Sequence, residues 1–251
     1  MNNFIKILND ILIVMSKIAT LVMLIPIIVA VFNRKYLNKQ LMIILSFSIL
    51  RLFTSLLLQL IVELIIRYRS YFVPILKKFE ITNMSFMAII AHLGNFALLG
   101  WYFSLIIENK KIKRIIRITS VFLFLAAIIN YFFFEGYKQP SVFNNTSSNI
   151  FCFILPLVHL WFLFHEDSKV PVAKNTYFWI SLGLIIPNLT GIITSIIGKK
   201  LRMTDVALSL QVDIIYSVLQ ILGYLLIAVG FYYARYTKYL PQKTSAPLPP
   251  Q

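Results

Sequence analysis

Polar side chains recur at helical spacing inside an apolar stretch of the sequence, residues 48–63. The polar positions lie four residues apart and include Arg51, Ser55, Gln59 and Glu63. In an α-helix this spacing places the side chains on one face. Because an arginine at the centre of a bilayer costs about 2.5–3.5 kcal/mol, we expect this face to look toward other helices or a water-filled cavity.

A second polar face occurs near the C-terminal end of the sequence, with polar residues three or four positions apart: Ser209, Asp213, Tyr216 and Gln220. His92 and Asn95 lie one helical turn apart in another apolar stretch, and Asn188 interrupts a third. At a rise of about 1.5 Å per residue, most of these groups reach a similar depth. We expect a polar pocket in the outer half of a helix bundle, with these ligand-binding residues: Arg51, Gln59, Glu63, His92, Asn95, Asn188, Asp213 and Tyr216.

Some of these residues have a simpler interpretation. Amides inside a membrane often only hydrogen-bond to a neighbouring helix and fix its packing, at about 0.6 kcal/mol per contact, and this applies to Gln59, Asn95, Asn188 and Gln220. The carboxylates are costlier to bury and favour a functional role, although Glu63 can instead lie at the interface beside lipid headgroups. Arg51 can be the counter-ion of either carboxylate, in a functional or a structural salt bridge.

No catalytic or metal-binding motif accompanies these residues. The three histidines form neither HxxxH nor HExxH, and GxSxG, Walker A and GxGxxG are missing. The single cysteine, Cys152, lies in an apolar run and suits packing. We expect His159 to be a packing hydrogen-bond partner, and ligand binding without a metal or cofactor.

The composition predicts a membrane protein. Of 251 residues, 59% are hydrophobic, and the mean hydropathy is +0.81, too apolar for a soluble domain. The apolar segments, each long enough or nearly long enough to span a bilayer, are residues 11–32, 41–66, 84–107, 115–134, 149–165, 175–197 and 207–235. The sequence therefore predicts an all-α bundle of seven transmembrane helices in one domain, residues 1–243, and a disordered Pro-rich tail, residues 244–251.

The basic residues predict orientation rather than nucleic-acid binding. The chain has 24 Lys and Arg against 9 Asp and Glu, and most cations lie between the apolar segments, where they meet anionic headgroups. The first, third and fifth connections and the tail, with Arg117 beside them, carry 13 of these cations, and the opposite side carries 9. We expect the N-terminus outside and the C-terminus inside a bacterial plasma membrane.

Two segments echo each other: residues 97–107 and 220–230 align Gly100 with Gly223 and Trp101 with Tyr224. Apolar helices produce such echoes by coincidence, but a true duplication would give three helices, a linker helix and three helices. With seven segments, this layout resembles microbial rhodopsins and PQ-loop sugar transporters, and also many uncharacterised seven-helix bacterial membrane proteins. The chain departs from both named families, because no lysine occurs between Arg202 and Lys238 to hold retinal, and leucine rather than glutamine follows Pro156. The resemblance therefore implies the layout, with no retinal and no transferred site residue.

These observations favour a sensor or receptor-like membrane protein with a small-ligand pocket. The connections are too short to encode an output domain, so a sensor needs a separate signalling partner. A small-solute transporter is the alternative, and its path would continue inward past Arg51, Tyr102 and His159. An enzyme or a structural subunit is the remaining possibility.

The predicted topology can be tested with reporter fusions. Fusions at Lys111 and Gln139 follow the third and fourth segments, so their reporters should lie on opposite faces of the membrane. Two reporters on the same face would contradict the arrangement.

Overall fold

The computed structural model describes residues 2–81, 87–135, 141–165 and 171–237, which contain helices and no strands. Seven helical segments are long and apolar enough to cross a membrane, which confirms the predicted all-α bundle of an integral membrane protein. Four segments are single helices: α3 (Lys39–Arg67), α8 (Val142–His165), α9 (Thr176–Thr204) and α10 (Val206–Thr237). The first segment consists of α1 (Asn2–Val22) and α2 (Leu24–Phe32). The third consists of α5 (Ala88–Gly94), the π-helical η3 (Asn95–Leu99) and α6 (Gly100–Ile106), and the fourth of α7 (Lys110–Ile129) and the π-helical η4 (Asn130–Phe134). The expected disordered tail lies outside the described residues.

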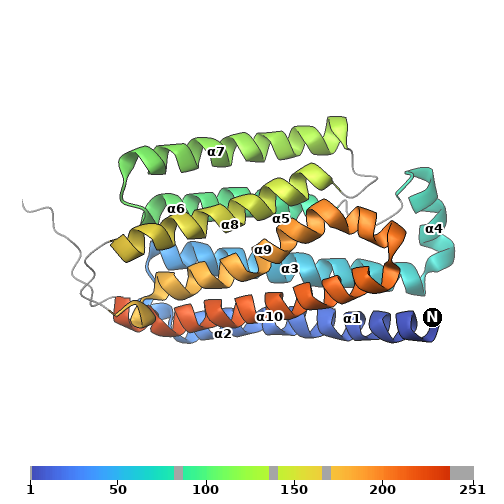
Figure 1. Cartoon of the computed structure of the whole chain (residues 1–251), viewed down its shortest axis with the longest axis horizontal. Helices are drawn as coiled ribbons and strands as arrows, with labels where there is room; N and C mark the ends of the chain where they lie inside the picture. Colours follow the sequence, from blue (N-terminus) through green and yellow to red (C-terminus); the bar gives the residue numbers. More distant parts are fainter. Residues whose placement is uncertain (1, 82–86, 136–140, 166–170, 238–251) are drawn as a thin grey trace, which may run out of the picture.

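Successive segments run in opposite directions along the bundle (Figure 1). We call the end that holds the N-terminus the N-side, and the opposite end, where α10 finishes, the C-side. The pair α1 and α2 packs on α10, α10 on α9 and α9 on α8, while α3 and α5 to α6 lie between them. Helix α7 lies at the edge of the bundle, packed mainly on α5, η3 and α6.

Helix boundaries follow from local chemistry. Three helices begin after an asparagine whose side chain accepts hydrogen bonds from the first free amides: Asn38, Asn109 and Asn175. The first segment breaks between Val22 and Leu24, because Pro26 has no N–H to donate to the carbonyl four residues before it. Pro156 and Pro187 lie inside α8 and α9, and each helix continues through its proline as one element.

One helix was not predicted. The second connection, residues 67–83, contains α4 (Arg69–Lys78), which is too short to span a membrane and has no buried residue. It lies across the N-side end of the bundle (Figure 1). Its exposed aromatic and basic side chains suit a helix at a membrane interface.

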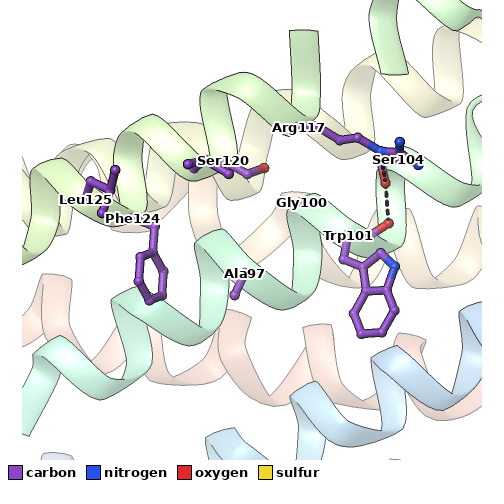
Figure 2. A pocket seen from close by; sticks show the side chains of 9 residues that line it. Ala97, Gly100, Trp101, Ser104, Arg117, Ser120, Phe124 and Leu125 are labelled. Carbon is purple, nitrogen blue, oxygen red and sulfur yellow. Dashed lines mark hydrogen bonds between the residues drawn. The ribbon is translucent and has the colours of Figure 1, made fainter. Parts of the chain in front are cut away.

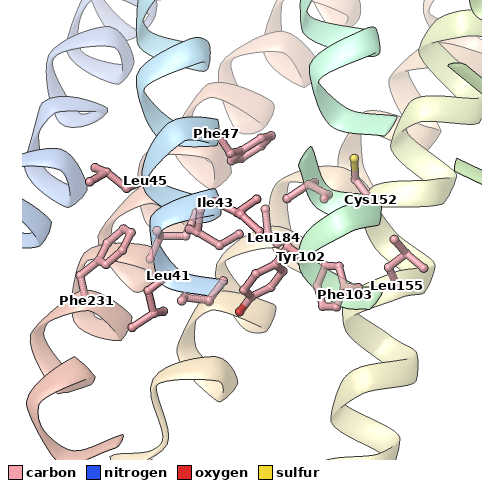
Figure 3. Close-up of a cluster of buried hydrophobic side chains, with 14 of the residues drawn as sticks. Leu41, Ile43, Leu45, Phe47, Tyr102, Phe103, Cys152, Leu155, Leu184 and Phe231 are labelled. Atoms are coloured by element: carbon pink, nitrogen blue, oxygen red, sulfur yellow. The ribbon is translucent and has the colours of Figure 1, made fainter. Parts of the chain in front are cut away.

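The C-side half of the bundle holds a cluster of buried apolar side chains (Figure 3). Among its fully buried side chains are Leu41, Tyr102, Phe103 and Phe231, which come from α3, α6 and α10. Lipid tails are as apolar as these residues, so close van der Waals packing rather than water exclusion holds the core together.

Helices α9 and α10 touch through two glycines. A Cβ added at Gly223 would lie 2.6 Å from the carbonyl oxygen of Gly183, and one at Gly183 would lie 2.6 Å from that of Gly223. Gly100, the residue that Gly223 echoes, packs instead on Ser120 of α7. The echoed residues therefore have different partners.

Enlarging this glycine contact should destabilise the bundle. We expect Gly223→Ala to cost about 1–3 kcal/mol, because the new methyl meets backbone that cannot move aside. Gly198→Ala in α9 is the matched control, since its methyl meets no atom within 4 Å. Thermal unfolding in detergent measures both, and equal melting temperatures for the two variants would contradict the close packing.

Candidate functional site

A cavity of about 600 Å³ extends from the α9–α10 connection at the N-side into the middle of the bundle. Helices α3, α5, α8, α9 and α10 line it together with η3. Its polar lining consists of Arg51, His92, Asn95, Asn145, Ser148, Asn149, Thr194, Ser195, Arg202, Ser209, Asp213 and Tyr216. Five of the eight predicted ligand-binding residues are in this set: Arg51, His92, Asn95, Asp213 and Tyr216.

Arg51 is the residue on which the polar interior converges. It lies 12 residues after the start of α3, about 18 Å along the helix, and it is half-buried. Besides the cavity, it lines two smaller spaces, one beside Ser55 and Gln220 and one beside Tyr216 and Tyr224. Among the described residues, no carboxylate lies within ion-pair distance of its guanidinium. The cation therefore faces polar hydroxyls and amides without a counter-ion.

Asp213 is paired with a different arginine. Its Oδ2 lies 3.4 Å from Nη2 of Arg202, whose side chain is 67% exposed against 27% for Asp213. The interpretation of Asp213 as the counter-ion of Arg51 is therefore wrong in this structure. The reason is position, because Asp213 lies on the N-side part of α10, near the end of α9 that carries Arg202. The pair lies toward the N-side end of the cavity, where water weakens it.

His92 and Asn95 bring unsatisfied polar atoms to the cavity. Both ring nitrogens of His92 are buried and make no hydrogen bond of good geometry, although the side chain of Asn145 lies close to the ring. Oδ1 of Asn95 is buried without a hydrogen-bond partner. Nδ2 of Asn95 donates to the hydroxyl of Ser148 at 2.7 Å. Asn95 also begins the π-helical turn η3, a distortion found frequently at functional sites. Buried atoms without partners are costly, so this part of the wall suits a polar guest.

Gln59 and Asn188 do not line the cavity. Nε2 of Gln59 donates to Thr20 at 2.7 Å, and Thr20 is 2.8 Å from Ser55, so these residues join α1 to α3. Nδ2 of Asn188 donates to the carbonyl of Leu184 in its own helix at 2.6 Å. Asn188 lines only the small space shared with Arg51 and Tyr216. Both residues fit the packing interpretation.

Glu63 does not share the cavity. Its side chain is exposed, and it lies one turn before Arg67 at the N-side end of α3. The expectation that it points into the bundle is wrong, because a carboxylate so close to the helix end reaches water or headgroups without turning inward. This position matches the alternative of an interface residue.

Helix α8 contributes to the cavity in a way that was not predicted from the sequence. Residues 142–148 were assigned to a polar connection, but they form the first two turns of α8, and Asn145, Ser148 and Asn149 line the cavity. A signal was present, since the predicted segment 149–165 is the shortest of the seven and lies at the lower limit for crossing a bilayer. Extending it toward the N-terminus by two turns gives the observed 24 residues.

A cluster at the N-side end anchors these first turns of α8. Ser141 accepts from the backbone N–H of Asn144 at 3.0 Å, and its hydroxyl donates to the carboxylate of Glu135. The same carboxylate accepts from Asn130 Nδ2 at 2.7 Å and from the backbone N–H of Phe143 at 3.1 Å. Burial alone would raise the pKa of Glu135, but these hydrogen bonds outweigh it and hold the pKa below its ordinary value of 4.5.

On the C-side of Arg51 the polar residues are packed. His159 Nδ1 lies 2.9 Å from the hydroxyl of Ser181, as expected of a packing residue. Its ring also packs against Phe103 and Tyr177. Within the described ranges, no three His, Cys, Asp or Glu side chains gather closely enough to hold a metal ion.

Searches of the chain against protein-family models, curated proteins and solved structures find no match. The site is therefore interpreted from its own geometry.

The Glu135 cluster predicts a pH dependence of stability. Because the folded pKa lies below the unfolded one, the ionised carboxylate stabilises the protein above about pH 4.5, and this contribution is lost as the pH falls through the folded pKa. Glu135→Gln should cost about 0.3–1 kcal/mol at neutral pH, the usual value of an anion at a helix N-terminus. Its melting temperature should also fall less than that of the unmodified protein as the pH drops.

Thermal unfolding in detergent across this pH range measures the effect. Glu108→Gln, which removes an exposed carboxylate from another connection, is the control and should keep the full pH dependence. A Glu135→Gln profile parallel to that of the unmodified protein would contradict the anchoring role.

Proposed function

We propose that the protein is a receptor-like membrane sensor that binds a small ligand with an anionic group in the cavity. The observation that carries this proposal is Arg51, a cation near mid-membrane with no carboxylate partner among the described residues. An uncompensated charge in a low-dielectric interior is expensive, and a bound anion removes that cost. Intramembrane ionisable groups are functional candidates by default.

The rest of the lining suits a small organic anion. A guanidinium recognises a carboxylate or phosphate through two parallel hydrogen bonds. The buried ring of His92 and the side chains of Asn145 and Asn149 add further hydrogen-bonding groups, while Leu58 and Val212 offer apolar contact. A volume of about 600 Å³ is within the range for small-molecule sites.

The orientation completes the proposal. The excess of basic residues at the C-side favours placing that end in the cytoplasm, so the cavity would face the exterior. The fully buried side chains of Tyr102, Phe103 and Phe231 close the C-side half. A cavity that is closed at the C-side fits a protein that binds its ligand without transporting it. A separate cytoplasmic protein would then receive the signal.

A small-solute transporter is the second candidate. The observation that favours it is the hydroxyl of Tyr102, which is buried toward the C-side of Arg51 and has no hydrogen-bond partner. In a transporter this conformation would be the outward-facing one, and the Tyr102 hydroxyl would meet the solute after the core opens.

Ligand-dependent stabilisation tests the binding site. The purified full-length protein is heated with a panel of small carboxylates and phosphate monoesters, and with their neutral amide or alcohol analogues. An anion at 100 times its dissociation constant stabilises the folded state by about 2.7 kcal/mol, so a clear rise in melting temperature is expected. Arg51→Gln should abolish the rise, and Arg51→Lys should retain part of it.

Arg67→Gln, at the exposed end of the same helix, is the matched control and should respond like the unmodified protein. Stabilisation by neutral analogues, or an unchanged response of Arg51→Gln, would overturn the proposal. Uptake of the stabilising anion into proteoliposomes then separates the two candidates, since a sensor gives no flux above that of empty liposomes.

A further inference from the structure

A second hollow lies on the outside of the bundle, between α6 and α7 (Figure 2). Its volume is about 520 Å³. We call it the α6–α7 groove, and it is lined by Ala97, Gly100, Trp101, Ser104, Arg117, Ser120, Val121, Phe124 and Leu125. It shares no residue with the cavity around Arg51. Helix α7 lies at the edge of the bundle (Figure 1), and the exposed side chains of Trp101, Val121 and Leu125 place the groove on the outer surface.

Polar and apolar groups are separated along the groove. Toward the C-side, Nε of Arg117 lies 3.4 Å from the hydroxyl of Ser104 (Figure 2). Toward the membrane centre, Val121, Phe124 and Leu125 make the wall apolar. Arg117 and Leu125 are eight residues apart, or about 12 Å along the helix. This is the order of groups in a phospholipid, with a charged headgroup at one end and an acyl chain at the other.

The charge beside the groove is strongly positive. The first two turns of α7 and the turn after them carry five cations: Lys110, Lys111, Lys113, Arg114 and Arg117. Glu108 is the acid in the preceding connection. In the part of the chain that the structure describes, none of these cations is in an ion pair. Lys39 adds a further cation, with its Nζ 5.6 Å from the ring centre of Trp101.

We propose that the α6–α7 groove binds an anionic phospholipid. The headgroup phosphate lies against Arg117 and the neighbouring basic residues, and one acyl chain fills the groove beside Trp101 and Phe124. The charge favours an anionic lipid over a zwitterionic one, at about a factor of five for each additional headgroup contact. A second copy of the chain is disfavoured, because two-fold pairing on α7 would bring two basic segments together.

Trp101 is a built-in probe, since it lines the groove and its side chain is 48% exposed. In a protein with Trp161→Phe and Trp179→Phe, it is the only tryptophan left. This protein is reconstituted in phosphatidylcholine that contains a small fraction of brominated lipid, either phosphatidylglycerol or phosphatidylcholine. Bromine quenches tryptophan only at close range, so the fluorescence reports which lipid occupies the groove.

Brominated phosphatidylglycerol should quench Trp101 at a several-fold lower mole fraction than brominated phosphatidylcholine. Arg117→Gln should reduce this preference, and Arg117→Lys should keep most of it. The matched control is Arg67→Gln at the N-side end, which should leave the preference unchanged.

Equal quenching by the two lipids would overturn the proposal, because the groove would then hold bulk lipid. Absence of quenching by either lipid would also overturn it, because protein, such as a second copy, would then cover the groove. A preference that survives both Arg117→Gln and the removal of charge at Lys113 and Arg114 would show that these cations do not select the lipid.

Discussion

The structure depends on one property of the bilayer: hydrocarbon offers no hydrogen bonds. Backbone groups must therefore be satisfied within helices, and polar side chains must turn toward one another or toward water. A chain that is 59% hydrophobic can place most of its surface against lipid and needs few inward polar residues. Those few then gather in a small space, and Arg51 lies at its deepest point.

This constraint explains which features could be predicted from the sequence. The seven segments and the inward faces of α3 and α10 follow from hydrophobicity and helical spacing alone, so Arg51, Asp213 and Tyr216 were placed correctly on the cavity wall. The constraint weakens toward the membrane surface. There Glu63 turned outward, α4 formed within an expected connection, and residues 142–148 became helix rather than loop.

Other features depend on which helices become neighbours, which spacing within one helix does not reveal. Asp213 pairs with Arg202 because the ends of α9 and α10 meet at a short connection. Asn95 meets Ser148 only because α8 packs beside η3. The π-helical turns likewise have no distinct sequence pattern, although both begin with an asparagine.

The glycine contact between α9 and α10 has a mechanical consequence. Gly183 and Gly223 bring two backbones together on the C-side of the cavity, and Gly230, two turns further along α10, makes a second close approach to the carbonyl of Thr176. Two helices held together at both places cannot separate in their C-side halves without losing these contacts. A guest in the cavity can therefore move α9 and α10 apart only at their N-side ends, with the C-side contact as the fixed base of that motion.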